Sequence, residues 1–209
     1  MRVVTYNIKS GLGGIQAVAG QIRALAPDVA CLQEVRKDQE RELAAALGMV
    51  PAKISLVARY EYGNALLLPE DPAWVREIRF EAGRDREPRG CIVAGIDGVA
   101  VGSVHLGLDA RQRVAQAIEL IDALAELPDV VIGGDLNEVP GGAVLSAMLA
   151  RFSDSFGDAG SGEGSTFPSH RPNRRIDYVM TAGRPRAVAC RAVDTPVSDH
   201  LPVVADLRF

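Results

Sequence analysis

The chain has 209 residues, of which 47% are hydrophobic and 24% charged, values typical of a globular protein and, at this length, of one domain over residues 1–209. Lys and Arg number 23 against 27 Asp and Glu, giving a net charge of −4, which argues against tight binding of long duplex DNA. No uncharged apolar run is long enough to span a membrane, and the N-terminal sequence lacks the apolar core of a signal peptide, so we expect a cytoplasmic protein.

Apolar runs and periodicities predict strands alternating with helices. In chain order, we expect strands at Val3–Tyr6, Asp28–Leu32, Ile54–Val57, Ala65–Leu68, Val75–Phe80, Cys91–Ile96, Val99–Val104, Val130–Ile132, Ile176–Met180, Val188–Ala192 and Val203–Leu207. We expect helices from about Ile15 to Leu25, Asp38 to Leu47, Asp109 to Leu127 and Gly142 to Leu149, and a loop over Gly157–Ser165.

Asp97-Gly98, between two of these strands, is a two-residue hairpin signal. Strands outnumber helices and come in both hairpin and crossover arrangements, which predicts an α/β fold with a mixed sheet, or two sheets packed together, under outer helices. Periodicity alone leaves both layer arrangements open. The three cysteines lie in or beside apolar runs, so we expect reduced, buried thiols.

Polar residues suited to catalysis or metal binding fall where apolar strands end, and strand ends are where sites gather. They are Asn7, Glu34, His105, Asp135 with Asn137, Asp177, and Asp199 with His200. Each has a structural alternative when it is taken alone: a turn residue, a helix start or a structural histidine. The interest lies in their number and common position.

Asp135 and Asn137 lie in the hexapeptide IGGDLN. In an extended segment side chains two apart point the same way, so a carboxylate and an amide converge there and are able to hold a water molecule and take its proton. Glu34 offers the oxygen ligand that Mg²⁺ or Mn²⁺ prefers. Asp177 is suited to fix the tautomer of His200 and favour its charged form.

Two groups of arginines add positive charge. Arg89 begins a strand and is placed to reach a phosphate, with an ordinary salt bridge as the alternative. The segment SHRPNRR before Asp177 contains Arg171, Arg174 and Arg175, and guanidinium groups suit phosphate recognition. A solvated loop is the alternative for this segment.

The segments TYNI, LQEV, GNALLL, SVHL, GGDLN, RIDYVM and SDHLPV stand in an order that resembles the endonuclease/exonuclease/phosphatase superfamily. The resemblance runs from Met1 to Phe209 and implies a four-layer α/β/β/α sandwich of two mixed sheets with outer helices. It also implies a site at one edge of the sandwich.

Carried over residue by residue, the resemblance makes Glu34 the main metal ligand, with Asn7 beside it and Asp199 assisting. Asp135 would activate the attacking water, and Asn137 would position it. Asp177 and His200 would form a dyad at the scissile phosphate. His105 would contact the phosphate or leaving group, and Asn64 and Arg89 would lie near the phosphate.

We therefore expect a hydrolase of phosphate esters, either a phosphodiesterase or a phosphatase, with Mg or Mn as cofactor. The short loop after Asn7 and the lack of long basic insertions favour a small or end-positioned substrate over internal sites in a duplex. Two alternatives stay open: a nuclease acting on single-stranded or damaged DNA, and a non-catalytic phosphate-binding module.

Overall fold

A computed structural model describes residues 1–52, 55–56, 62–81 and 89–209. It contains two sheets. In the first, the strands run in the order β12 (Arg186–Ala192), β13 (Val203–Arg208), β1 (Arg2–Asn7), β2 (Val29–Arg36), β5 (Tyr62–Leu68) and β3 (Val50–Pro51), and β4 (Ser55–Leu56) pairs with β5. In the second, they run β10 (Ser153–Asp154), β11 (Asp177–Ala182), β9 (Val130–Asp135), β8 (Val99–His105), β7 (Gly90–Ile96) and β6 (Trp74–Arg79).

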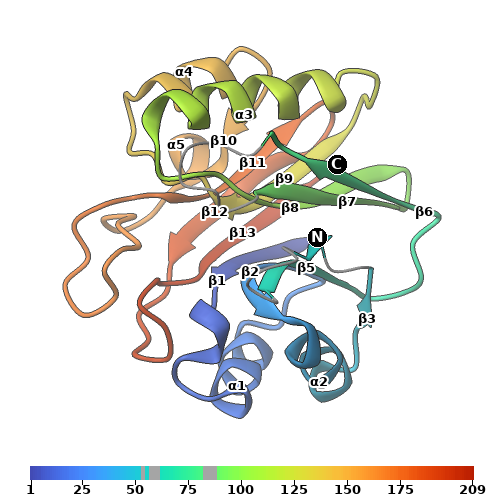
Figure 1. The fold of residues 1–209 in the computed structure, drawn as a ribbon, viewed down its shortest axis with the longest axis vertical. Coiled ribbons are helices and arrows are strands. Elements are labelled where there is room, and N and C mark those ends of the chain that lie inside the picture. Colours follow the sequence, from blue (N-terminus) through green and yellow to red (C-terminus); the bar gives the residue numbers. More distant parts are fainter. Residues whose placement is uncertain (53–54, 57–61, 82–88) are drawn as a thin grey trace.

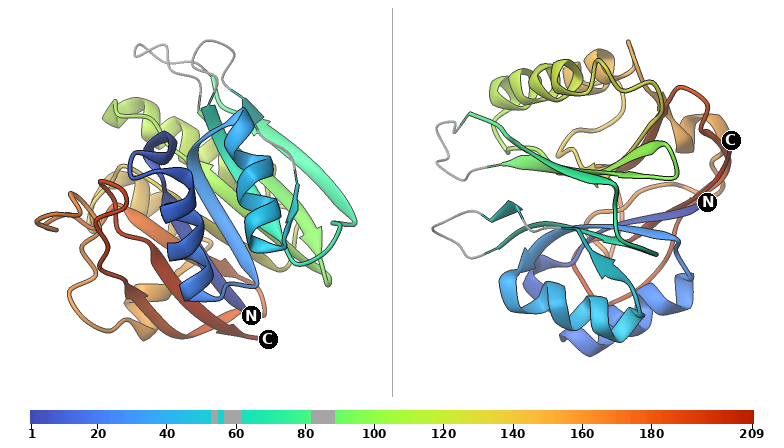
Figure 2. Two further views of the ribbon diagram at one scale, coloured as in Figure 1. Left: turned by 90° about the horizontal axis from the view of Figure 1, so that it is seen from below. Right: turned by 90° about the vertical axis from the view of Figure 1, so that its right-hand side faces the viewer.

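Helices cover the outer faces of both sheets (Figure 1). Helices α1 (Ile15–Leu25) and α2 (Lys37–Leu47) lie against the first sheet, and α3 (Ala110–Ala123) and α4 (Ala143–Met148) cover the second. The short helix α5 (Ser155–Ala159) contacts β12 of the first sheet as well as β10 and β11 of the second. A 3-10 turn, η1 (Lys9–Gly11), follows β1. Side views separate the four layers (Figure 2). Each sheet contains parallel and antiparallel pairs, so the expected α/β/β/α sandwich of mixed sheets is confirmed.

Three apolar clusters fill the spaces between the layers, and strand alternation decides which residue enters which cluster. In β1, Val3 joins the cluster between the sheets, while Val4 and Tyr6 join the cluster under α1 and α2. In β9, Val131 faces the other sheet and Ile132 faces the helices above it. The inward-facing side chains of the two sheets therefore pack against each other as one continuous apolar layer, which extends toward the site.

Several boundaries differ from those that the sequence predicts. The long helix ends at Ala123, four residues before Leu127, and Asp109 caps its N-terminus by accepting hydrogen bonds from two backbone N–H groups. Part of the predicted loop Gly157–Ser165 is helical, because α5 extends to Ala159 with Asp154 as its cap. The predicted strand Ile54–Val57 lies partly outside the described residues, and β4 occupies its two described positions.

Two other expectations, the hairpin turn and the buried cysteines, are confirmed. Asp97 and Gly98 both have positive φ, at 50° and 74°, as the turn of a two-residue hairpin requires. All three cysteines are free and buried. None of the helices formed by the described residues has the length and apolarity that crossing a bilayer requires.

Candidate active site

The site forms where the inner faces of both sheets change from apolar to polar. In β1 the inward row runs Val3, Thr5, Asn7, and in β9 it runs Val131, Gly133, Asp135, so the last inward residue of each strand is polar. Gly133 permits the close approach of the sheets, because a Cβ there would lie 2.8 Å from the Cβ of Cys31. Strand alternation alone thus directs polar side chains toward one end of the core.

Sheet register brings three of the predicted site residues side by side. His105 of β8 is the parallel partner of Asp135 of β9, and Asp177 of β11 is the antiparallel partner of Asp135. All three are at most 4% exposed. Burying charged groups this deeply requires partners.

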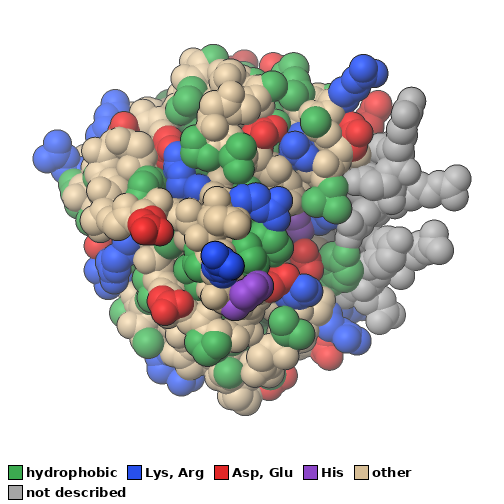
Figure 3. All heavy atoms as spheres, turned by 90° about the vertical axis from the view of Figure 1, so that its left-hand side faces the viewer, with side chains coloured by type: hydrophobic (Ala, Val, Ile, Leu, Met, Phe, Trp, Pro, Cys, Tyr) green, Lys and Arg blue, Asp and Glu red, His purple; other side chains and the backbone are tan. Residues whose placement is uncertain are grey.

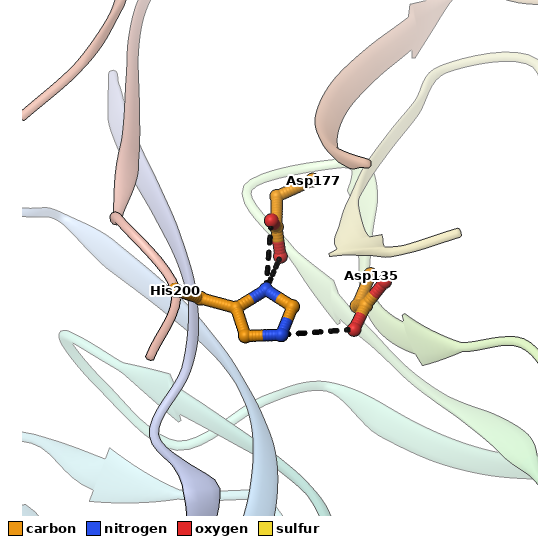
Figure 4. Close-up of side chains that lie close together, drawn as sticks. All are labelled: Asp135, Asp177 and His200. Carbon is orange, nitrogen blue, oxygen red and sulfur yellow. Dashed lines mark hydrogen bonds and ion pairs between the residues drawn. The ribbon is translucent and has the colours of Figure 1, made fainter. Parts of the chain in front are cut away.

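Asp177 and Asp135 both face His200, which enters from the loop before β13. The Nδ1 atom of His200 lies 2.9 Å from Oδ2 of Asp177, and its Nε2 lies 3.7 Å from Oδ2 of Asp135 (Figure 4). Burial lowers the pKa of His200, but the charge and hydrogen bond of Asp177 and the charge of Asp135 outweigh it, and the pKa rises to about 9. The imidazole is therefore charged near neutral pH, with Nε2–H directed toward Asp135.

The surroundings of Asp135 favour its neutral form, whereas those of His200 favour the charged form, because Asp135 is buried beside another acid. Burial and the charge of Asp177 raise its pKa to about 7, although His200 and the hydrogen bonds from Asn7 and Asn137 lower it. The backbone N–H of Asn137 donates to Oδ1 of Asp135 at 2.9 Å. A carboxyl group with a pKa near the working pH is suited to accept a proton from water.

His105 lies on the other side of Asp135, with Nε2 3.4 Å from Oδ2. A guanidinium nitrogen of Arg89 lies 2.8 Å from its Nδ1. Burial and then the charges of Arg89 and His200 hold the pKa of His105 well below its usual value. We therefore assign a neutral imidazole. The same nitrogen of Arg89 also lies 3.0 Å from Nε2 of His105, and Nδ2 of Asn137 lies 3.3 Å from that Nε2.

Asn7 joins the acidic residues of the two sheets. Its Nδ2 donates to Oε1 of Glu34 at 3.2 Å and to Oδ2 of Asp135 at 3.1 Å. Glu34 stands in a bulge where β2 loses register with β5 between Leu32 and Val35, and its φ is 54°. A bulge changes the direction of a side chain. Here the Glu34 carboxylate accepts a hydrogen bond from Asn7 and does not follow the alternation of the strand.

The structure does not place every predicted residue around the carboxylates. Asn64 is buried, and its amide donates to the carbonyl oxygens of Gly90 and Ser103. It ties the first sheet to the backbone of β7 and β8. Arg175 is paired with Asp154 at 2.7 Å and stacks on Tyr178, so its charge is already engaged.

Other members of the expected arginine patch stay near the site. Phe167 packs against the imidazole of His200 with ring centroids 4.8 Å apart, and the guanidinium of Arg174 lies 4.6 Å from the centroid of Phe167. Arg171 is exposed in the same loop. On this face, Lys and Arg side chains surround a hollow that contains acidic and histidine side chains (Figure 3).

Sequence reasoning missed two contributors. Lys9 pairs with Asp199, with Nζ 2.5 Å from Oδ2, and its position two residues after Asn7 was the available signal. Gln33 is fully buried and donates to Thr5 in its own sheet and to Ser103 in the other, at 3.2 and 3.0 Å. A buried glutamine in an apolar strand, directly before Glu34, was the corresponding signal.

The chemistry of the donors decides where a divalent cation fits. Asp135, Asp177 and His200 offer ligand atoms within 4.8 Å of one another, but a charged imidazole has no lone pair to give a metal. Glu34 and Asn7 offer oxygen donors at the open side, beside a crowd of carboxylates that a dication would balance. Oxygen donors of this kind fit Mg²⁺ or Mn²⁺.

Comparison with known proteins identifies a family and related folds. The sequence profile of the Endonuclease/Exonuclease/phosphatase family matches residues 4–200. The uncharacterized protein YbhP of Escherichia coli K12 is 26% identical over an alignment that covers 100% of this chain and 96% of YbhP.

Two solved structures share the fold over the whole chain. The mannosyl-6-phosphatase Bt3783 of Bacteroides thetaiotaomicron superposes with a TM-score of 0.86 at 16% identity, covering 100% of each chain. TDP2 of D. rerio, complexed with a single-strand DNA product, superposes with a TM-score of 0.84 at 15% identity, covering 100% of this chain and 99% of that one.

Proposed function

The chain belongs to the endonuclease/exonuclease/phosphatase family, and we propose that it is a divalent-metal-dependent phosphoesterase acting on small phosphate esters. The enzymes in the family's name are all hydrolases of phosphate esters. The observation that carries the proposal is the row His105–Asp135–Asp177 with His200 facing it. This row pairs a buried carboxyl group of pKa about 7 with an imidazole of pKa about 9. A phosphate-binding module without catalysis has no need of this pairing.

Asp135 is the proton acceptor in this proposal. Its Oδ1 is held by the N–H of Asn137 and its Oδ2 by the amide of Asn7, so its carboxylate is fixed before substrate arrives. Water bound between Asp135 and Asn137 loses a proton to Asp135 as its oxygen forms a bond to phosphorus. The ester P–O bond on the opposite side of phosphorus breaks at the same time, and the leaving oxygen takes its proton from solvent. General bases of this kind contribute about 10²- to 10⁴-fold to the rate.

His200 stabilises the charge that develops on the phosphoryl oxygens. Asp177 orients its ring through Nδ1 and keeps it protonated, which leaves Nε2–H to donate to an oxygen of the phosphate. Donors fixed in advance in a buried site are worth more than the same groups in water. Neutral His105 lies on the other side of Asp135, with Nε2 3.4 Å from Oδ2.

Glu34 and Asn7 are the residues that would hold the cation, and Asp199 would join them only by leaving Lys9. When bound, Mg²⁺ or Mn²⁺ would supply a Lewis-acid contact to a phosphate oxygen. The cation would also offset the mutual repulsion of the carboxylates, which adds to the effect of burial in raising the pKa of Asp135.

The preference for a small substrate is supported by charge. The net charge is −4, and two arginines expected at the site, Arg89 and Arg175, are engaged with His105 and Asp154. Affinity for long nucleic acid grows with the number of cations that contact phosphates. We therefore place plasmid DNA below small esters as a substrate.

The experiment measures product release from nitrophenyl phosphate, bis-nitrophenyl phosphate, short single-stranded oligonucleotides and plasmid DNA, with Mg²⁺, with Mn²⁺ and with chelator. We expect turnover of at least one small ester that requires a divalent cation, and slower cleavage of the plasmid. Efficient nicking of the plasmid with no small-ester turnover would replace the proposal with a nuclease. No turnover of any substrate with either cation would contradict it.

A further inference from the structure

Lys9 lies beside Asp199 at the acidic opening of the site, which is formed by Glu34 and Asp199, and its backbone conformation needs an explanation. Its φ is 44° and that of Ser10 is 53°, so two consecutive residues other than glycine adopt the left-handed region. Such residues are strained and persist only where their surroundings hold them. Here Oδ1 of Asn7 accepts from the backbone N–H of Lys9, and Nε2 of Gln39 donates to the carbonyl of Ser10.

The strained turn fixes where the ammonium group goes. Its Nζ lies 2.5 Å from the carboxylate of Asp199, the residue next to His200. The ammonium group is thus held by an acid from the loop before β13, while Asn7, two residues before Lys9, donates to Glu34 of β2.

This ion pair is open to exchange. The side chains of Lys9 and Asp199 are 49% and 24% exposed, and an ion pair this exposed contributes little to stability. Lysine carries its charge on a flexible stem with several donors. Moving Nζ from Asp199 to an incoming anion would cost little and would leave the backbone turn in place.

The charges around the reaction centre indicate which anion needs Lys9. Arg89 is buried against His105, and His200 is directed at one phosphoryl oxygen in the proposed function. A phosphodiester carries one negative charge, and a phosphomonoester carries two near neutral pH. Lys9 places a partly exposed ammonium group beside Asp199, the sequence neighbour of His200, and so offers a cation for the second charge of a monoester.

Building on the proposed function, we propose that Lys9 is a substrate-binding residue that takes the second negative charge of a phosphomonoester, so that the site selects monoesters over diesters. Asp199 holds the ammonium in place until the substrate arrives. The mannosyl-6-phosphatase fold neighbour acts, by its name, on a monoester, which is compatible with this selection.

The test compares two substrates with the same leaving group, nitrophenyl phosphate and methyl nitrophenyl phosphate, at saturating Mg²⁺. They differ by one methyl group and one charge. For Lys9→Met we expect kcat/KM to fall about ten- to a hundredfold on the monoester and about threefold on the diester. The larger loss is the expected effect of removing a hydrogen bond between charged groups. Lys9→Arg should recover most of the monoester rate.

Two further measurements separate this role from a structural one. Arg208→Met removes an exposed cation at the far end of β13 and should change neither rate. Calorimetry with inorganic phosphate in Mg²⁺ should show weaker binding to Lys9→Met by about the same factor as the monoester rate.

Equal losses on both esters, or unchanged phosphate binding, would overturn the assignment of Lys9. A wild-type protein that hydrolyses the diester alone would also overturn it, while leaving the proposed function standing. Absence of turnover on both esters, with normal phosphate binding that depends on Lys9, would instead contradict the proposed function.

Discussion

Strand β9 has an aspartate at each end, and the two carboxyl groups have opposite electrostatics. Asp129, directly before the strand, accepts hydrogen bonds from the backbone and side chain of Arg184, which lower its pKa. Asp135, at the other end, has a pKa raised to about 7 by burial and by Asp177. The raised pKa of Asp135 marks the second end as the candidate site, since strongly perturbed pKa values gather at functional sites.

Arg2 and Asp206 repeat the stable arrangement at the same end as Asp129. They are joined by two hydrogen bonds of 2.7 and 3.0 Å, and the pKa of Asp206 is lowered by Arg2. At the site end, by contrast, one amide of Asn7 links two carboxylates. Local charge balance therefore distinguishes the reaction centre from the rest of a uniform sandwich.

The largest effect is expected at Glu34, where removing the charge removes the principal oxygen ligand at the open side. Glu34→Gln should lower turnover in Mg²⁺ by orders of magnitude and weaken Mn²⁺ binding, measured by calorimetry, while the fold persists. Asp206→Asn, at the stable end, should leave Mn²⁺ binding unchanged. Full turnover of the Gln variant, or of the wild type in excess chelator, would refute the metal assignment.

The second prediction treats Asp177 and His200 as one unit. Asp177→Asn and His200→Ala should each remove most of the rate, and the double variant should lose little more, because groups that act together are not additive. In Asp177→Asn the pKa of His200, followed by NMR titration of the metal-free protein, should fall from about 9. Two losses that multiply would show that the residues act independently.

The third prediction concerns stability and pH. Asp135 and His200 have pKa values above their unfolded ones, about 7 against 3.8 and about 9 against 6.5. Their contributions to stability are therefore full at low pH and are lost as pH rises through 7 and through 9 respectively. In chelator the melting temperature should fall as the pH rises through 7 and toward 9. Added Mg²⁺ should raise the melting temperature more at pH 8 than at pH 5.

Asp129 and Asp206 provide the internal control for that titration. Their pKa values are lowered, so their contributions are present above the unfolded value of 3.8 and disappear only as pH falls below it. Asp129→Asn should remove part of the acid limb of the stability curve and leave the decline toward pH 9 unchanged. A wild-type protein whose stability rises between pH 5 and 9 in chelator would contradict the assigned shifts.

Much of the site could be predicted because strand periodicity and sheet register are local consequences of sequence. The alternation that buries Val131 also turns Asp135 inward, and the run GGD permits the close packing beside it. The family resemblance supplied what periodicity left open, namely four layers and not two. The structure accordingly brings several of the polar residues at strand ends close together.

Contacts that depend on distant side chains were not predictable. The pairing of Lys9 with Asp199 joins positions 190 apart in the chain, and no local pattern encodes it. Arg175 reads as part of a basic patch, yet Asp154 and Tyr178 engage it. Asn64 stands directly before the buried apolar run Ala65–Leu68 and ties the sheets together, a role that only the packing of β5 on β7 and β8 creates.

The most direct test returns to the two ends of β9. It measures kcat/KM of the wild type, Asp135→Asn and Asp129→Asn on one small phosphate ester in Mg²⁺ at pH 8. Loss of a general base predicts a fall of about 10²- to 10⁴-fold for Asp135→Asn, while Asp129→Asn keeps the wild-type rate. Equal rates for the wild type and Asp135→Asn would show that the crowded carboxylate is not the proton acceptor, and would contradict the account.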